Sequence, residues 1–132
     1  MTSGQGNDLG TFSVLADAGE VAAFRAALGL AEQHAGDVPA TYAIRWLAAG
    51  EVRAALMTLV SEPDLIPVHE AQTFGYVEPL TCGIVYRMNV RAHRTCAPDR
   101  LLVDATISDE RGTRHVEMAT TLRLISTAEA AP

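Results

Sequence analysis

The stretch Ile84-Val-Tyr-Arg-Met-Asn-Val-Arg-Ala92 places an apolar residue at every even position and mostly polar residues between them. Successive side chains of a β-strand point to opposite faces, so this pattern predicts a strand with one buried face. The stretches Leu101–Ile107 and Val116–Leu124 repeat the alternation. Turn-forming residues separate the three stretches at Ala97–Asp99 and Ser108–Gly112, which is typical of antiparallel hairpins.

Upstream of these strands the apolar residues recur with the period of a helix. The segment Ile44–Val60 carries an apolar stripe at helical spacing and predicts one long helix. A shorter helix is predicted after Asp17, whose side chain can cap its first turn, and it is expected to stop at Gly29. A short edge strand at Thr11–Leu15 and a less regular strand at Pro67–Val77 complete the set.

Four consecutive strands and one long apolar helix predict an α+β protein. An antiparallel sheet with one apolar face can cover a single helix by curling around it, which is the hot-dog fold. We expect one such domain over residues 11–126, with a flexible leader at 1–10 and a tail at 127–132. The open sheet edge and the open end of the core favour a dimer, formed with an identical chain or with a second hot-dog protein.

Composition excludes several classes of function. The chain of 132 residues has a formal net charge of −6, which argues against nucleic acid as a partner. No apolar run approaches the roughly 20 residues of a membrane helix, so we expect no membrane partner. Cys82 and Cys96 lie at opposite ends of one predicted strand, too far apart for a disulfide, and match no zinc pattern. We therefore expect a cytoplasmic protein without a metal or other cofactor.

Three segments resemble the MaoC-like hot-dog family, and in particular its N-terminal, fatty-acid-synthase-type dehydratase half-domain. They are Val38-Pro-Ala-Thr-Tyr42, His69-Glu-Ala-Gln-Thr-Phe74-Gly-Tyr76-Val-Glu-Pro79-Leu80 and Glu117-Met-Ala-Thr-Thr121. The resemblance spans roughly residues 12–126. It implies an acyl thioester substrate, on coenzyme A or acyl carrier protein, and the addition or removal of water across its 2,3-bond.

The sequence departs from that family at its catalytic dyad. Catalytic members carry an Asp and, five residues later, a His before the long helix, followed by a His-Gly at the helix entry. If His34 took the His position, Gly29 would take the Asp position, and the His-Gly is absent. His34 and Asp37 share a loop but have no third group beside them. The resemblance therefore also fits a non-catalytic half that shapes the acyl pocket for a partner.

The candidate catalytic residues are His69 and Glu51. His69 lies in the segment shared with the family, and its imidazole titrates near neutral pH, as a general acid or base must. The alternative is a histidine at a strand end that bonds neighbouring backbone. Glu51 lies on the long helix and would act as a base or orient water. The alternative is a solvated glutamate on an exposed face.

Candidate substrate-binding residues lie at the helix entry and on one strand. Tyr42 and Trp46 are four residues apart, so they share a helix face and either line an acyl pocket or close the end of the core. The backbone amides at Thr41–Ile44 would offer donors to a thioester carbonyl. Arg87 and Arg91 belong to a basic strand face that would dock coenzyme A phosphates or an acidic carrier, or is an ordinary solvated face.

These features leave three functions open. The first is an acyl-thioester hydratase or dehydratase, acting alone or as half of a heterodimer. The second is a hot-dog thioesterase in which His69 or Glu51 activates water. The third is a subunit that forms the acyl pocket without catalysing a reaction.

Overall fold

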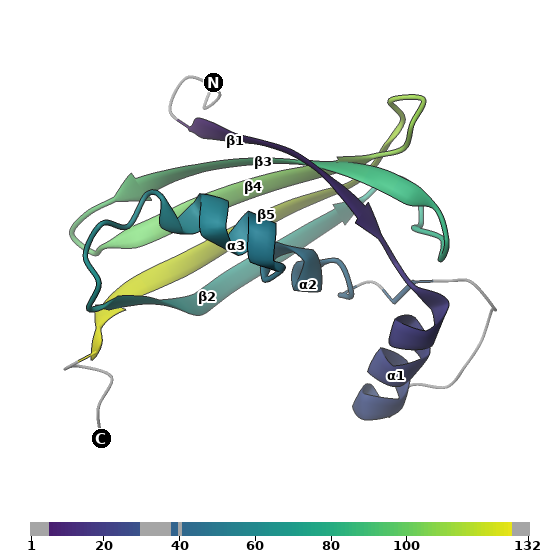
Figure 1. Cartoon of the computed structure of the whole chain (residues 1–132), viewed down its shortest axis with the longest axis horizontal. Coiled ribbons are helices and arrows are strands. Elements are labelled where there is room, and N and C mark those ends of the chain that lie inside the picture. Colours follow the sequence, from purple (N-terminus) through teal and green to yellow (C-terminus); the bar gives the residue numbers. More distant parts are fainter. Residues whose placement is uncertain (1–5, 30–37, 40, 128–132) are drawn as a thin grey trace.

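The computed structural model describes residues 6–29, 38–39 and 41–127. Its strands are β1 (Asn7–Leu15), β2 (Leu65–Tyr76), β3 (Val85–Thr95), β4 (Arg100–Ser108) and β5 (Arg114–Ser126), and its helices are α1 (Ala18–Leu28), α2 (Ile44–Leu47) and α3 (Gly50–Met57). In this part of the chain the strands form one antiparallel sheet in the order β1-β3-β4-β5-β2. The sheet curves around α2 and α3, while α1 projects beyond its end (Figure 1). The predicted hot-dog architecture is therefore confirmed.

The alternating residues of the central strands form the core beneath the helices. Tyr86, Met88, Val90 and Ala92 of β3 are at most 2% exposed, as the alternation predicts. The corresponding residues of the neighbouring strands, Leu101, Val103, Ala105 and Ile107 of β4 and Val116, Met118 and Leu124 of β5, are also buried. Ile84 was expected at the start of the β3 strand, but it precedes the strand and is 45% exposed.

The predicted long helix is divided into two, which corrects the sequence-based expectation. α2 ends in tight turns at Ala48, and Ala49 adopts an extended backbone with φ −63° and ψ 148°. Gly50 then begins α3; glycine is a poor helix former and weakens the helix at this point. Both helices contribute to the core on either side of the break, since Leu47 of α2 and Leu56 of α3 are both buried.

The sheet edges are β1 and β2. β1 begins at Asn7, so residues 7–10, expected in the leader, are part of the strand. β2 pairs with β5 and not with β3, the next strand along the chain. The segment between β2 and β3 therefore crosses from one edge of the sheet toward the other. This crossing leaves β2 as an edge strand of the sheet.

α1 is held by its capping and by aromatic contacts. The Asp17 carboxylate accepts a hydrogen bond from the Glu20 amide at 3.0 Å, and Gly29 ends the helix with φ 70°, both as predicted. Phe24 packs edge-on against Tyr42 with ring centroids 5.2 Å apart. The Tyr42 hydroxyl donates to the Glu20 carboxylate at 3.3 Å. These contacts join α1 to the segment that enters α2.

An ion cluster joins the segment after α3 to the β3–β4 turn. The Arg94 guanidinium donates to the carboxylates of Glu62 and Asp99, each at 2.8 Å, and to the Leu59 carbonyl at 3.3 Å. The hydrogen bonds from Arg94 lower the pKa of Glu62 from its ordinary 4.5 to about 2. The same guanidinium lowers the pKa of Asp99.

This cluster predicts a loss of stability in acid. A carboxylate whose pKa is lower in the folded state stabilises the fold above its unfolded pKa, and this contribution disappears as the pH falls from about 4.5 toward 2. We expect Arg94→Met to be less stable than the wild type at pH 5.5. Between pH 5.5 and pH 3, the variant should lose less stability than the wild type loses. Urea midpoints at the two pH values measure this. Arg114→Met, which removes an exposed pair with Glu117, is the control. Equal pH dependence of wild type and Arg94→Met would contradict the expectation.

Candidate functional site

An apolar cavity of about 230 Å³ lies between the two central helices and strands β2, β4 and β5. Leu47, Leu56 and Met57 line it from the helices, and Leu101, Val103 and Leu122 line it from the sheet. Its polar lining groups among the described residues are Arg53, His69 and Thr120. A pocket with apolar walls and few polar groups is the usual form of a small-molecule site.

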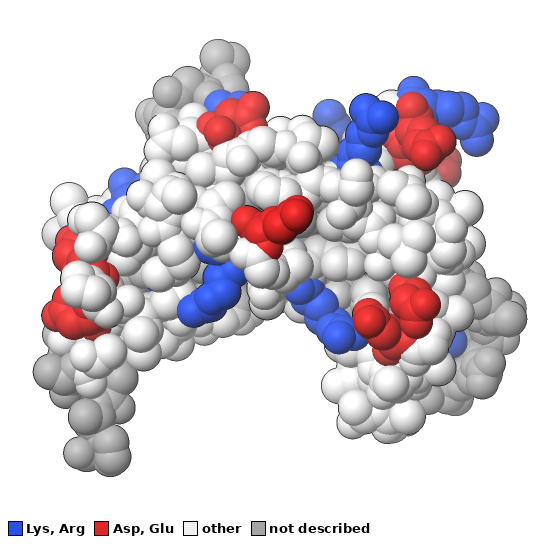
Figure 2. All heavy atoms as spheres, viewed as in Figure 1, with Lys and Arg blue, Asp and Glu red and all other residues white. Residues whose placement is uncertain are grey.

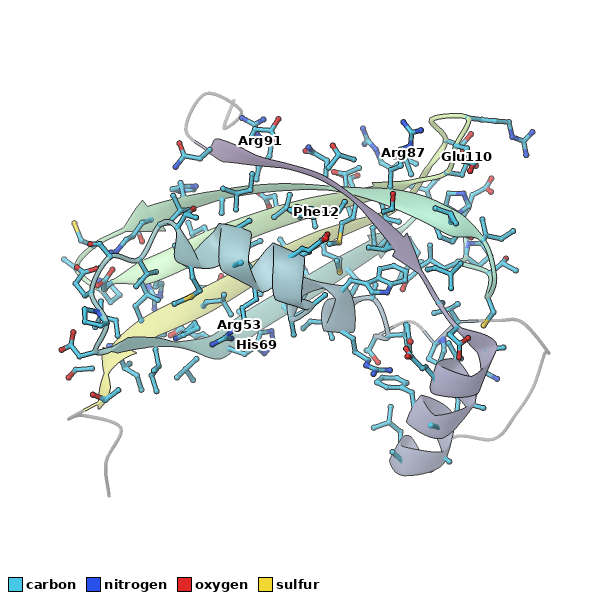
Figure 3. The ribbon with its side chains drawn as sticks, viewed as in Figure 1. Phe12, Arg53, His69, Arg87, Arg91 and Glu110 are labelled. Carbon is cyan, nitrogen blue, oxygen red and sulfur yellow. The ribbon has the colours of Figure 1, made fainter. Side chains whose placement is uncertain are left out.

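Arg53 of α3 and His69 of β2, labelled in Figure 3, both line this cavity. Both side chains are exposed. The structure therefore places one of the two predicted catalytic residues on the cavity, whose lining also includes an arginine that sequence reasoning did not single out.

A β-bulge turns His69 toward the cavity together with Gln72. His69 pairs with Leu122 and Ala71 with Thr121, so Glu70 is an extra residue in β2. Without a bulge, residues three apart would point to opposite faces of the sheet. With it, His69 and Gln72 lie opposite the inward-facing Leu122 and Thr120 of β5. The bulge also explains why the alternation of β2 is irregular in the sequence.

Gln72 and Thr120 determine how the His69 ring is held. The Thr120 hydroxyl donates to Gln72 Oε1 at 2.6 Å, and Gln72 Nε2 donates to the Thr73 carbonyl at 3.1 Å. These two bonds fix the orientation of the amide. His69 Nε2 lies 3.3 Å from the same Oε1, which can only accept, so Nε2 carries the hydrogen. Nδ1 of the neutral ring is then left with a lone pair that can accept a proton.

Glu70 anchors the bulge on the outer face of the sheet. Its carboxylate accepts two hydrogen bonds from Arg100, at 2.6 and 3.1 Å, and lies 3.9 Å from the Arg123 guanidinium. The hydrogen bond from Arg100 lowers the pKa of Glu70. Arg100 and Arg123 are direct partners in the sheet, so Glu70 also separates two like charges. The ion pairs of Glu70 therefore stabilise the bulge that orients His69 toward the cavity.

Glu51, the second predicted catalytic residue, is exposed in the first turn of α3 and is not among the described residues that line the cavity. Arg53, two residues further along the same helix, does line it. The structure thus does not bring Glu51 and His69 together at this cavity.

The predicted substrate-binding residues at the helix entry lie away from the cavity. Tyr42 is 1% exposed, its ring packs edge-on against Trp46 at 6.1 Å, and burial raises its pKa. Arg45 lies over the Tyr42 ring at 5.0 Å. Tyr42 and Trp46 thus close the end of the core. The Tyr42 and Ile44 amides donate to backbone carbonyls in turns, and Thr41 itself is exposed. These two amides are not free to bind a thioester carbonyl.

Arg87 and Arg91 lie on the outer face of the sheet, opposite the helices (Figure 3). Arg91 donates to the Gly6 carbonyl at 3.1 Å and lies 3.8 Å from the Asp8 carboxylate. Neither arginine lines the apolar cavity. His34 and Asp37, which the sequence places in one loop, lie outside the described residues.

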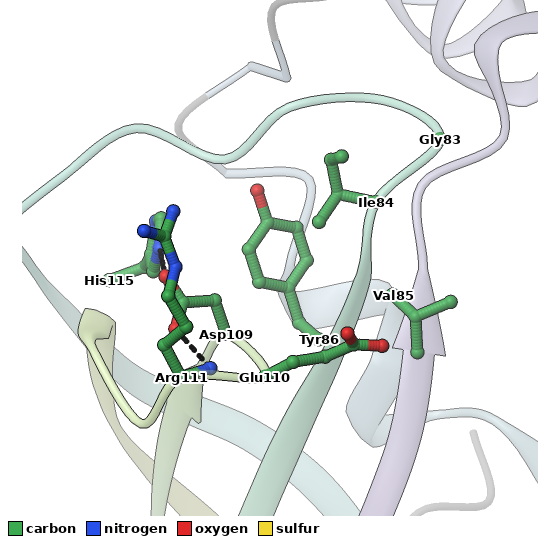
Figure 4. Close-up of a pocket in the computed structure, with 8 residues that line it drawn as sticks. All are labelled: Gly83, Ile84, Val85, Tyr86, Asp109, Glu110, Arg111 and His115. Atoms are coloured by element: carbon green, nitrogen blue, oxygen red, sulfur yellow. Dashed lines mark hydrogen bonds and ion pairs between the residues drawn. The ribbon is translucent and has the colours of Figure 1, made fainter.

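A second, more open cavity of about 530 Å³ lies between the start of β3 and the β4–β5 hairpin (Figure 4). It contains a buried histidine that sequence reasoning missed. His115 Nε2 lies 3.1 Å from the Asp109 carboxylate and Nδ1 lies 3.0 Å from the Pro79 carbonyl. The hydrogen bond with His115 lowers the pKa of Asp109. Both ring nitrogens are engaged, so His115 holds the hairpin against the 77–81 segment and has no nitrogen free for a ligand.

No group of three His, Cys, Asp or Glu side chains among the described residues is arranged to hold a metal ion. None of the helices in the described part of the chain has the length and apolar character needed to cross a membrane.

Comparison with known proteins identifies the fold. No protein-family model and no curated protein matches the sequence. Among solved structures, a hot-dog-like protein from Thermanaerovibrio acidaminovorans is 11% identical with a TM-score of 0.73, covering 96% of this chain and 86% of that one. The C-terminally truncated HadBC (3R-hydroxyacyl-ACP dehydratase) complex from Mycobacterium tuberculosis is 13% identical with a TM-score of 0.73, over 92% and 96%. The fluoroacetyl-CoA thioesterase FlK is 12% identical with a TM-score of 0.72, over 96% and 90%. At these identities the likenesses show one property: the chain has the hot-dog fold.

Proposed function

We propose that this chain is an acyl-thioester hydratase or dehydratase of the hot-dog type, acting on an acyl group carried by coenzyme A or acyl carrier protein. The cavity supports this proposal because its apolar walls can hold an acyl chain and its lining includes His69, whose Nδ1 carries a lone pair in the tautomer that Gln72 favours. The solved structures of similar fold include a 3-hydroxyacyl-ACP dehydratase complex.

His69 is suited to both proton transfers of hydration. As the oxygen of water adds to C3 of an enoyl thioester, His69 Nδ1 accepts one proton of that water. The resulting imidazolium then donates a proton to C2, so the net reaction adds one molecule of water across the 2,3-bond. Dehydration follows the same steps in reverse. Gln72 keeps the ring in the orientation that leaves Nδ1 available.

Thioester hydrolysis is the second candidate, and one observation favours it. No Asp or Glu lines the apolar cavity among the described residues, so His69 has no acidic partner there. A base and a cation on the same cavity, His69 and Arg53, suit the attack of water on a carbonyl, with His69 accepting the proton and the thiol leaving. FlK, of the same fold, is a thioesterase.

Identification of products decides between these functions. Purified protein should be incubated separately with enoyl, 3-hydroxyacyl and saturated thioesters of coenzyme A. Interconversion of the first two supports the proposal, whereas release of free coenzyme A from any of them supports hydrolysis. No reaction with any substrate by the chain alone, but reaction after addition of a second hot-dog protein, supports the half-domain alternative.

We further propose that the chain assembles through β2. This strand is paired only with β5 among the described strands, and Ile66 and Val68 on its outer face are 36% and 40% exposed. An edge strand with apolar side chains is suited to pair with another chain. His69 lies on the same strand, so a partner here would lie next to the cavity.

We expect a dimer that the double variant Ile66→Lys/Val68→Lys converts to a monomer, because two added charges on each β2 would repel. Light scattering at micromolar concentration measures this. Leu15→Lys on the opposite edge, where Leu15 is 43% exposed, is the matched control and should leave the dimer intact. A monomeric wild type, with and without candidate partners, would contradict assembly through β2.

A further inference from the structure

Arg53 is the charged side chain of α3 that faces the apolar cavity. It lies three and four residues before Leu56 and Met57, which line the same cavity, so all three share one face of the helix. His69 of β2 lines the same cavity from the sheet, and both residues are labelled in Figure 3. Arg53 is therefore, with His69 and Thr120, one of the few polar residues among the described lining of an otherwise apolar space.

No hydrogen bond or ion pair joins the Arg53 side chain to any described residue, whereas Arg94, Arg100 and Arg114 all bind carboxylates. The protein contains 16 acidic residues, yet none of those described lines this cavity. Charged groups are scattered over the side of the molecule seen in Figure 2 and do not form one broad field. An anion at this cavity would thus be recognised by Arg53 itself.

We infer that the cavity binds medium-chain carboxylates, with the Arg53 guanidinium holding the carboxylate and the apolar walls holding the chain. Arginine presents paired N–H donors that match a carboxylate, and charged hydrogen bonds of this kind are stronger than neutral ones. Resting on the proposed function, the same guanidinium would hold the carbonyl oxygen of a bound thioester, where negative charge develops during the reaction. Of the backbone amides at residues 41–44 that were expected to do this, those of residues 42 and 44 are used in turns.

The volume of the cavity gives an approximate length for the probe that tests this inference. A cavity of about 150 Å³ holds a benzene molecule, or about 25 Å³ for each carbon atom. At the same ratio, the cavity of about 230 Å³ holds roughly nine carbon atoms. Octanoate is therefore a suitable probe, and octanamide is its neutral counterpart of equal length.

Calorimetric titration at pH 7 tests the inference. We expect octanoate to bind the wild type more tightly than octanamide does, and Arg53→Gln to weaken octanoate binding about tenfold while leaving octanamide unchanged. Arg53→Lys, which keeps the charge but loses the paired donors, should show a smaller loss. Arg114→Gln, at an exposed position on β5, is the matched control for loss of one positive charge.

Equal octanoate affinity in wild type and Arg53→Gln would overturn the inference, and so would failure of the wild type to bind octanoate. Because Arg53 is exposed, the variant should remain folded, which circular dichroism checks. Binding and turnover give separate answers: Arg53-dependent binding of octanoate without thioester turnover supports the inference and rejects the proposed function, whereas turnover with Arg53-independent binding does the reverse.

Discussion

Replacement of His69 by alanine is expected to lower kcat/KM for the preferred acyl thioester by about a hundredfold or more, the usual contribution of a general acid or base. His69 is the histidine among the described residues that line the apolar cavity. Its loss removes the group that accepts and returns the proton. Initial rates with the thioester that reacts in the product-identification experiment measure the effect.

The controls separate chemistry from folding. His93→Ala removes a histidine from the outer face of β3 and should leave the rate unchanged. Gln72→Ala should give an intermediate loss of kcat/KM, because the orientation of the His69 ring depends on the amide oxygen. A His69→Ala variant that stays folded and turns over at the wild-type rate would exclude His69 and favour a partner chain as the source of the catalytic groups.

The sheet could be predicted from the sequence because its central strands each have one solvated face. Alternation in β3, β4 and β5 indicated the buried residues, and residues such as Met88, Leu101 and Val116 are fully buried. The helix break could not be predicted from the apolar stripe, because the stripe continues through Ala48–Gly50 while the backbone does not. The edge position of β2 depends on long-range pairing with β5, which periodicity alone does not determine.

The candidate site was predicted only in part, for a similar reason. His69 was found through a local segment, and the structure places it at the cavity. Its partners Gln72 and Thr120 were not identified, because the bulge at Glu70 changes which residues share a face. The irregular alternation of β2 was the available signal. Arg53 was missed because a charged residue at the margin of an apolar helix is usually solvated, and its exposure to the cavity depends on how α3 packs.

A second large effect is expected from Leu101→Ala, which affects both the core and the cavity. Leu101 is fully buried and lines the cavity from β4. Loss of its side chain should lower the free energy of unfolding by about 3 kcal/mol, as measured by urea denaturation. If the space stays open, the cavity gains room for about three carbon atoms, so the preferred acyl chain should lengthen accordingly.

Leu102→Ala is the matched control for this substitution, because Leu102 is the next residue of the same strand and points to the outer face of the sheet. It is only partly buried, so its replacement should cost about 1 kcal/mol or less and leave the chain-length preference unchanged. Equal destabilisation by both substitutions would contradict the assignment of the two faces of β4. If Leu101→Ala alone is strongly destabilising but the chain-length preference among active thioesters does not change, Leu101 is confirmed as a core residue and the cavity is excluded as the acyl site.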